Sequence, residues 1–238
     1  MSIVMAKKAT RFLIQQKIAV GLVAATIAIL IGYVSTLVVK ESPMLGDFVE
    51  GDHYTLLEKP RRIRGNKIEV MEFFSYGCIH CYNFDPTLAD WVKANSYKIN
   101  FIRTPVVSSE YWRILGRNYY AMEKLGLLGR YHLPFFREVH EVKRNFSPAT
   151  RLGDYFDGKG VTADEYMKAY NSPELATKVS AADQMARRLQ VSSVPTIIIH
   201  GKYQIRPTRA VGISRMLDVM DFLIEREITG KSGEPGQG

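Results

Sequence analysis

The sequence predicts an α/β protein in which one sheet, with helices on both faces, is interrupted by a helical insertion and preceded by one transmembrane helix. Three observations support this. Residues 18–39 contain no charged residue. Short apolar strands and amphipathic helices flank residues 108–172 on both sides. From residue 108 to about residue 170 the apolar residues recur at helical spacing, as at Tyr111, Leu115, Tyr119 and Met122.

Composition and charge exclude several classes of protein. The chain has 238 residues, 46% of them hydrophobic and 24% charged, which is the composition of a globular protein. Residues 1–40 hold five basic residues and no acidic one, which is most of the net charge of +8. The remaining 27 basic and 24 acidic residues nearly balance, so we expect no nucleic-acid partner. Two cysteines are too few for a disulfide scaffold or a four-cysteine zinc site, and we expect no metal and no cofactor.

Residues 18–39 are predicted to be a membrane anchor. A helix of these 22 residues is roughly 33 Å long, enough to cross a hydrocarbon core of about 30 Å. Four basic residues precede the segment, which places residues 1–17 in the cytoplasm and the body outside it. A cleaved signal peptide is the alternative, although its apolar core would be shorter and Val38-Val39-Lys40 is a poor cleavage site. Both interpretations export the body to an oxidising compartment.

The body reads as two halves of one sheet domain around the insertion. Strands are predicted at 53–57, 68–74, 98–107, 194–200 and 203–205. Helices are predicted from Gly77 to about Ala94, from Ser172 to about Gln190, and over 213–228. Aromatic residues of the insertion, such as Tyr119, Tyr120 and Phe135, are expected in its core.

The two cysteines form the pair Cys78-Ile79-His80-Cys81, directly after an apolar strand and at the start of a helix. A disulfide across this spacing closes so small a loop that it adds only roughly 2 kcal/mol of stability, against about 3 for a 15-residue loop. The spacing therefore favours a reversible dithiol. Cys78 should lie near the helix N-terminus, where N–H groups and the helix dipole stabilise a thiolate, and His80 adds to that effect. Cys81, one turn further, should be shielded. An inert disulfide and half of a metal site are the other interpretations.

Phe73-Phe74-Ser75 followed by Cys78-x-His80-Cys81 resembles the active-site segment of the DsbA family, which are periplasmic thiol:disulfide oxidases of the thioredoxin fold. Three further segments are similar in order: residues 54–60 to the first strand of the family, Val194-Pro195 to its Val and cis-Pro pair, and residues 201–204 to the hairpin that follows. The resemblance covers about residues 52–228. Ile79 departs from it, because the best-known members have proline there, and so does the predicted anchor.

The resemblance implies the chemistry of the site. A reduced, unfolded exported protein would attack the redox-active disulfide of Cys78 and Cys81 and form a mixed disulfide through Cys78. Val194, cis Pro195, Tyr76 and Gly77 would contact the substrate. Glu72, on the same strand face as Val70 and Phe74, is expected to be buried with a raised pKa, and the family's acid at this place is thought to exchange protons with the buried cysteine.

The resemblance also implies partners and a location. A quinone-linked membrane oxidase of the DsbB type would reoxidise the pair, and the protein would be a monomer in the bacterial inner membrane with its catalytic domain in the periplasm. The expected division of the chain is 1–17 cytoplasmic, 18–39 anchor, 40–51 linker, 52–107 and 173–229 thioredoxin-like domain, 108–172 helical insertion and 230–238 flexible tail. The alternatives are a disulfide reductase or isomerase of the same fold, and a membrane-tethered holdase without redox activity.

Overall fold

A computed structural model describes residues 21, 25–30 and 48–233 of the chain. The predicted anchor, residues 18–39, therefore lies largely outside the described residues, as do the predicted cytoplasmic segment and residues 234–238. Residues 21 and 25–30 are helical. Over the described part of the chain, we find no helix with both the length and the apolar character needed to cross a membrane.

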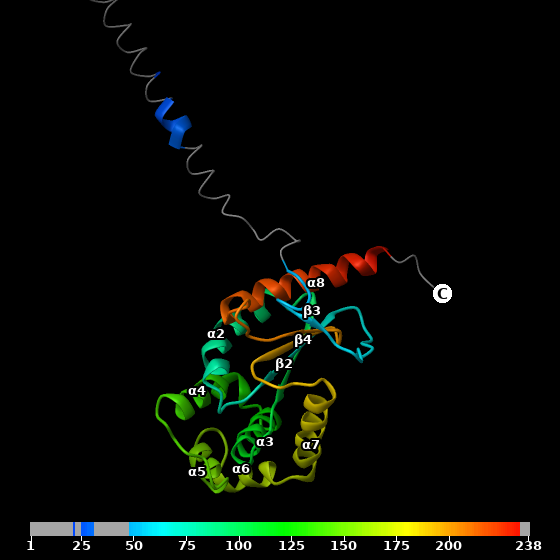
Figure 1. Ribbon diagram of the computed structural model, residues 1–238. Coiled ribbons are helices and arrows are strands. Elements are labelled where there is room, and N and C mark those ends of the chain that lie inside the picture. Colours follow the sequence, from blue (N-terminus) through cyan, green and yellow to red (C-terminus); the bar gives the residue numbers. More distant parts are fainter. Residues whose placement is uncertain (1–20, 22–24, 31–47, 234–238) are drawn as a thin grey trace, which may run out of the picture. The chain divides into compact units, whose positions relative to one another are not determined.

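Residues 48–233 contain one five-stranded sheet with the strand order β1-β5-β4-β2-β3 (Figure 1). The strands are β1 (Thr55–Leu56), β2 (Ile68–Phe74), β3 (Ile99–Pro105), β4 (Thr196–Ile199) and β5 (Tyr203–Ile205). β2 and β3 are parallel, and the other neighbouring strands are antiparallel. β2 lies between β4 and β3, and all seven of its residues are buried, as a strand covered on both faces requires.

Helices cover both faces of the sheet, as predicted. They are α2 (Ile79–Asn95), α3 (Glu110–Lys124), α4 (Leu128–His140), α5 (Thr150–Phe156), α6 (Ala163–Tyr170), α7 (Pro173–Arg188) and α8 (Met216–Gly233). Val70 and Ile197 pack against α2 and α8, whereas Met71 and Phe73 pack against residues of α7. This division follows from the alternation of side chains along a strand. The fold is that of a thioredoxin-like sheet domain with a helical insertion.

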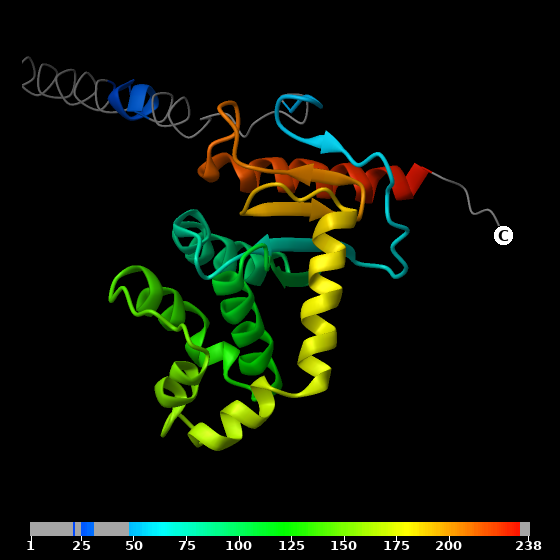
Figure 2. The same ribbon diagram turned by 60° about the horizontal axis from the view of Figure 1, so that its bottom comes forward.

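The helices α3–α6 form the insertion, and α7 runs from the insertion back to the sheet (Figure 2). The insertion has its own apolar core, which includes Leu115, Phe135 and Phe156. Phe74, at the end of β2, belongs to the same cluster, as do Cys78 and Cys81. The cysteine pair therefore lies where the insertion meets the sheet.

Several boundaries differ from the prediction. The strands predicted at 98–107 and 194–200 are shorter, at Ile99–Pro105 and Thr196–Ile199, and the first strand and the last helix also differ. The first strand is only Thr55–Leu56, because Tyr54 makes an isolated bridge with Glu50 instead of continuing the ladder. The last helix continues to Gly233, past the point where a flexible tail was expected to begin. Gly230 lowers helix propensity by about 1 kcal/mol but does not by itself stop a helix.

Candidate functional site

The cysteine pair lies at the N-terminus of α2. Cys78 is the N-cap residue of this helix, and its backbone N–H donates to Ser75 O at 3.0 Å. Its sulfur accepts a hydrogen bond from the backbone N–H of Cys81 at 3.4 Å. Cys81 has no exposed surface, whereas Cys78 is 8% exposed. Both cysteines are free thiols in this structure, and only Cys78 is open to attack from outside.

The surroundings of the two sulfurs separate their acidities. The largest influence on the pKa of Cys78 is the hydrogen bond from the Cys81 thiol, which lowers it and outweighs the partial burial of Cys78. The backbone N–H groups of Cys81 and His80 and the charge of His80 lower it further, so the pKa of Cys78 is about 6. Burial, followed by the hydrogen bond and charge of Cys78, raises the pKa of Cys81 well above its usual value. Near neutral pH the pair therefore holds one thiolate, at Cys78, and one thiol, at Cys81.

Ile79 and His80, between the two cysteines, point outward. Ile79 is 45% exposed and His80 is also exposed, on the first turn of α2. His80 therefore acts on Cys78 through its charge and its backbone N–H, as the sequence suggested.

Val194 and Pro195 face the cysteine pair across the site. Their peptide bond is cis, as the resemblance implied. The Cys78 thiol lies 3.5 Å from the carbonyl oxygen of Val194. Pro195 is buried and Val194 is half-buried.

Tyr76 does not lie where the sequence analysis expected a substrate contact. Its side chain is 1% exposed and packs against Phe135 and Phe136 of α4, and its hydroxyl lies 2.6 Å from Nδ1 of His132. Direct contact with a substrate is incompatible with this burial. The error arose because Tyr76 lies next to Gly77 in a turn, and only the packing of α4 reveals that the ring points inward.

Gly77 does lie at the site. It is half-buried, and a Cβ built on it would lie only 2.5 Å from Nε1 of Trp112. A larger residue would displace the indole ring that borders the cysteine turn, so this position requires glycine.

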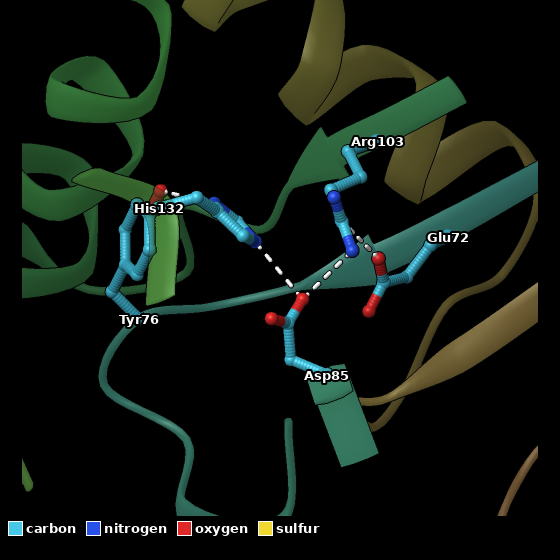
Figure 3. Close-up of polar contacts among 5 residues, drawn as sticks. All are labelled: Glu72, Tyr76, Asp85, Arg103 and His132. Atoms are coloured by element: carbon cyan, nitrogen blue, oxygen red, sulfur yellow. Dashed lines mark hydrogen bonds and ion pairs between the residues drawn. The ribbon is translucent and has the colours of Figure 1, made fainter. Parts of the chain in front are cut away.

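Glu72, which interacts electrostatically with both cysteines, belongs to a polar network with Arg103, Asp85 and His132. Figure 3 shows these four side chains together with Tyr76. Glu72 is 1% exposed, which confirms its predicted burial. Arg103 of β3 donates from Nε to Glu72 Oε2 at 2.8 Å and from a terminal nitrogen to Asp85 Oδ1 at 2.7 Å. Nε2 of His132 lies 3.0 Å from the same Asp85 oxygen. Burial raises the pKa of Glu72 to about 7, because desolvation outweighs the attraction of Arg103.

Three members of this network were not among the predicted residues. Arg103 is the single charged residue of β3 and lies directly opposite Glu72 in the parallel register, so the sequence contained a signal for this ion pair. Asp85 lies four residues after Cys81 on the buried face of α2, which is a weaker signal for a buried carboxylate near the cysteines. His132 comes from the insertion, and nothing in the sequence indicated its position.

The site combines a thiolate at a helix N-terminus, a buried thiol and a carboxyl group that titrates near neutral pH. These are the groups that thiol–disulfide exchange requires: a nucleophilic sulfur, a second sulfur that closes the disulfide, and a proton acceptor. Within the described residues, no three His, Cys, Asp or Glu side chains are grouped as a metal site would need.

Comparisons with known proteins agree with this chemistry. The family model for a DSBA-like thioredoxin domain matches residues 94–223, more than half of the chain. The thiol:disulfide interchange protein DsbA of Pseudomonas aeruginosa is 31% identical over 182 residues, which is 76% of this chain and 86% of the relative. The protein of the same name from Escherichia coli K12 is 27% identical over 207 residues, covering 80% and 95%.

Solved structures give the same result for the fold. The crystal structure of Pseudomonas aeruginosa DsbA has a TM-score of 0.74 and 30% identity, and the alignment covers 78% of this chain and 97% of that one. The oxidoreductase DsbA from Xylella fastidiosa has a TM-score of 0.71 and 28% identity, covering 76% and 98%. The chain therefore belongs to the DsbA family, and it is a thiol:disulfide oxidoreductase with a thioredoxin-like fold.

Proposed function

We propose that this protein donates the Cys78–Cys81 disulfide to reduced, newly exported proteins in the periplasm. The observation that carries the proposal is the difference between the sulfurs: Cys78 caps a helix and has a pKa of about 6, whereas Cys81 is fully buried. A stable Cys78 thiolate favours the reduced form of the pair, and this makes the disulfide an oxidant.

The proposed reaction has two exchange steps. A substrate thiolate attacks Cys78, the Cys78–Cys81 bond breaks, and Cys81 leaves as a thiolate that takes up a proton. A second substrate thiolate then attacks the substrate sulfur of the mixed disulfide and releases the Cys78 thiolate. The substrate loses two electrons and gains a disulfide, and the cysteine pair gains the two electrons. Glu72, buried below the pair and with a pKa of about 7, is the proposed donor of the Cys81 proton in this direction and its acceptor during reoxidation.

The substrate is proposed to lie as an extended strand beside Val194 and Pro195. The Val194 carbonyl already points to the Cys78 sulfur, so a strand that pairs with this backbone has its own cysteine within reach.

The redox equilibrium of the pair against glutathione, measured on the purified full chain, tests the proposal. Thioredoxin has a reduction potential of about −270 mV. We expect the potential of this pair to be higher by at least about 90 mV, which corresponds to a thousandfold difference in the equilibrium constant.

Replacing His80 by glutamine should raise the pKa of Cys78 by about half a unit and lower the potential of the pair by about 15 mV, because the charge of His80, although solvent-exposed, favours the thiolate. The thiolate absorbance against pH reports the pKa. A thioredoxin-like potential in the unmodified chain contradicts the oxidase and favours a reductase or isomerase.

A DsbB-like, quinone-linked membrane oxidase is the proposed partner for reoxidation, and residues 18–39 are proposed to anchor the protein beside it. The support is the uncharged run of 22 residues and the basic residues before it. We expect the full chain to stay with bacterial membranes through an alkaline wash, and a cysteine-specific reagent that cannot enter the cytoplasm to label Cys78. Release of the intact, uncleaved chain into the wash would reject the anchor.

A further inference from the structure

A continuous chain of hydrogen bonds joins the helical insertion to Glu72 of β2 (Figure 3). It begins at the Tyr76 hydroxyl, passes through both ring nitrogens of His132 to Asp85, and continues through Arg103 to Glu72. Of these side chains only His132 comes from the insertion, on α4. It therefore links the insertion to residues that surround the two cysteines.

The hydrogen positions in this chain follow from the groups involved. Arg103 can only donate, so the Asp85 oxygen between Arg103 and His132 accepts from both. His132 thus carries its proton on Nε2 and accepts at Nδ1 from the Tyr76 hydroxyl. Burial lowers the pKa of His132, which agrees with a neutral ring. Burial raises the pKa of Tyr76 well above its usual value, so the phenol keeps its proton.

One cation serves two carboxyl groups in this network. Arg103, Glu72 and Asp85 are all largely buried, with side chains 18%, 2% and 5% exposed. If both acids were ionised, the cluster would hold a net negative charge away from water, whereas one shared proton makes it neutral. The network therefore favours one proton on the pair of acids near neutral pH.

The hydrogen bonds determine which acid holds this proton. One oxygen of Asp85 accepts from Arg103 and from His132, whereas Arg103 is the single donor to Glu72 among the residues that the structure describes. More donors favour the ionised form. Burial works against ionisation of Asp85, but the hydrogen bond from His132 and the positive charge of Arg103 hold the Asp85 pKa below its usual value.

We propose that His132 is a positioning residue of the exchange reaction: by donating to Asp85 it keeps that carboxylate ionised and assigns the shared proton to Glu72, beside the cysteines. The inference rests on the proposed role of Glu72 in moving the Cys81 proton. Besides Tyr76 and Asp85, His132 is faced by Arg103 of β3 and by Tyr119 of α3, whose ring centre is 6.1 Å away; its other ring neighbours, Phe74 and Phe136, are apolar. Glu72 is faced by Arg103, by Asp85 and Cys81 of α2, by Cys78 at the N-cap of that helix and by Tyr119.

Two variants of His132 separate its two hydrogen bonds. Glutamine carries an amide N–H near the position of Nε2 and preserves the donor to Asp85. Asparagine reaches only the position of Nδ1, and preserves the acceptor for Tyr76 alone. Tyr166→Phe is the matched control, because it removes another buried hydrogen bond of the insertion, to Asn118, and leaves both hydrogen bonds of His132 in place. Thermal unfolding of all three confirms that each is folded.

The decisive measurement is the titration of Glu72 in the reduced full chain, followed by carbon-13 NMR of labelled glutamate carboxyl groups and assigned with Glu72→Gln. We expect His132→Asn to lower the Glu72 pKa by about one unit, since Asp85 then takes the proton and Arg103 is left to Glu72. His132→Gln and Tyr166→Phe should leave it within a few tenths. In an Asp85→Asn background, His132→Asn should cause no further shift. An unchanged Glu72 pKa in His132→Asn, or the same shift in the Asp85→Asn background, overturns the inference.

A kinetic measurement separates this inference from the proposed function. The attack of Cys81 on a Cys78–glutathione mixed disulfide should depend on pH through Glu72, and His132→Asn should move that dependence down by the same amount as the NMR titration. If the Glu72 pKa moves and the rate profile does not, the assignment of the proton to Glu72 by His132 is supported, and the proposed role of Glu72 in the exchange is rejected.

Discussion

Replacing Cys78 by serine should abolish disulfide transfer completely, whereas replacing Cys81 by serine should give a protein that captures its substrates. Cys78 is the sulfur open to attack from outside, and its thiolate, with a pKa of about 6, is the leaving group of the second exchange step. Without it neither step can occur. Without Cys81 the mixed disulfide at Cys78 can still form, but the intramolecular attack that would resolve it is lost. Such intramolecular attacks have effective concentrations of about 10⁵ M or more.

The measurement is mass spectrometry of each variant after incubation with a cysteine-containing peptide disulfide. We expect one peptide bound per Cys81→Ser chain for hours, none bound to Cys78→Ser, and only transient binding to the unmodified chain. Cys81→Ala is the folding control, because a serine hydroxyl at this fully buried position costs about 1–3 kcal/mol if it finds no partner.

A double variant, with both cysteines replaced by serine, tests the holdase alternative. A membrane-tethered holdase would protect unfolded chains from aggregation equally well after both cysteines are replaced by serine. Loss of oxidative folding in cells carrying that double variant, with its binding of unfolded chains intact, would show that the redox pair performs the function.

The parts of the site that could be predicted are those encoded by neighbouring residues. Strand β2, residues 68–74, has the predicted bounds because a run of apolar residues before a turn fixes a buried strand. The placement of Cys78 at a helix N-terminus followed from the same local pattern, and the cis bond before Pro195 followed from the resemblance. A second cis bond, before Pro148, was not anticipated, since nothing around Ser147 distinguishes it from an ordinary turn.

The parts that could not be predicted depend on how the insertion folds back. His132 reaches Asp85 across 47 residues of sequence, and Tyr76 reaches His132 across 56. No local pattern fixes such pairings, because they depend on how α4 packs over the end of β2. For the same reason Tyr76 was assigned to the substrate surface when its ring is in the core of the insertion.

Loss of Arg103 should cost several kcal/mol of stability, and the cost should depend on pH. It is the cation between two buried carboxyl groups, and removing one partner of a buried ion pair costs about 3–5 kcal/mol. We expect Arg103→Met to lower the free energy of unfolding by about that amount at pH 8, as measured by urea denaturation. At pH 5 the loss should be about half as large.

The larger cost of Arg103→Met at the higher pH follows from the pKa of Glu72. In the unmodified protein burial raises it from 4.5 to about 7, so this group stabilises the fold at low pH and the contribution is lost as the pH rises through about 7. Arg103 opposes this rise. Without Arg103 the Glu72 pKa is higher still, and at pH 8 the fold must either bury an unpaired carboxylate or take up a proton. At pH 5 Glu72 is neutral with or without Arg103. The variant then loses only the ion pair between Arg103 and Asp85, and His132 still donates a hydrogen bond to Asp85.

Arg117→Met is the matched control for this pH dependence. Arg117 also comes from a half-buried position, but it donates to the backbone carbonyls of Tyr170 and Ser172, which do not titrate. Its loss should therefore cost the same free energy at pH 5 and pH 8. An equal cost at both pH values for Arg103→Met would mean that Glu72 is not protonated in the folded protein, and it would remove the proton that the exchange mechanism assigns to it. A cost that grows with pH in Arg103→Met alone places the titrating group in the network beneath the cysteines.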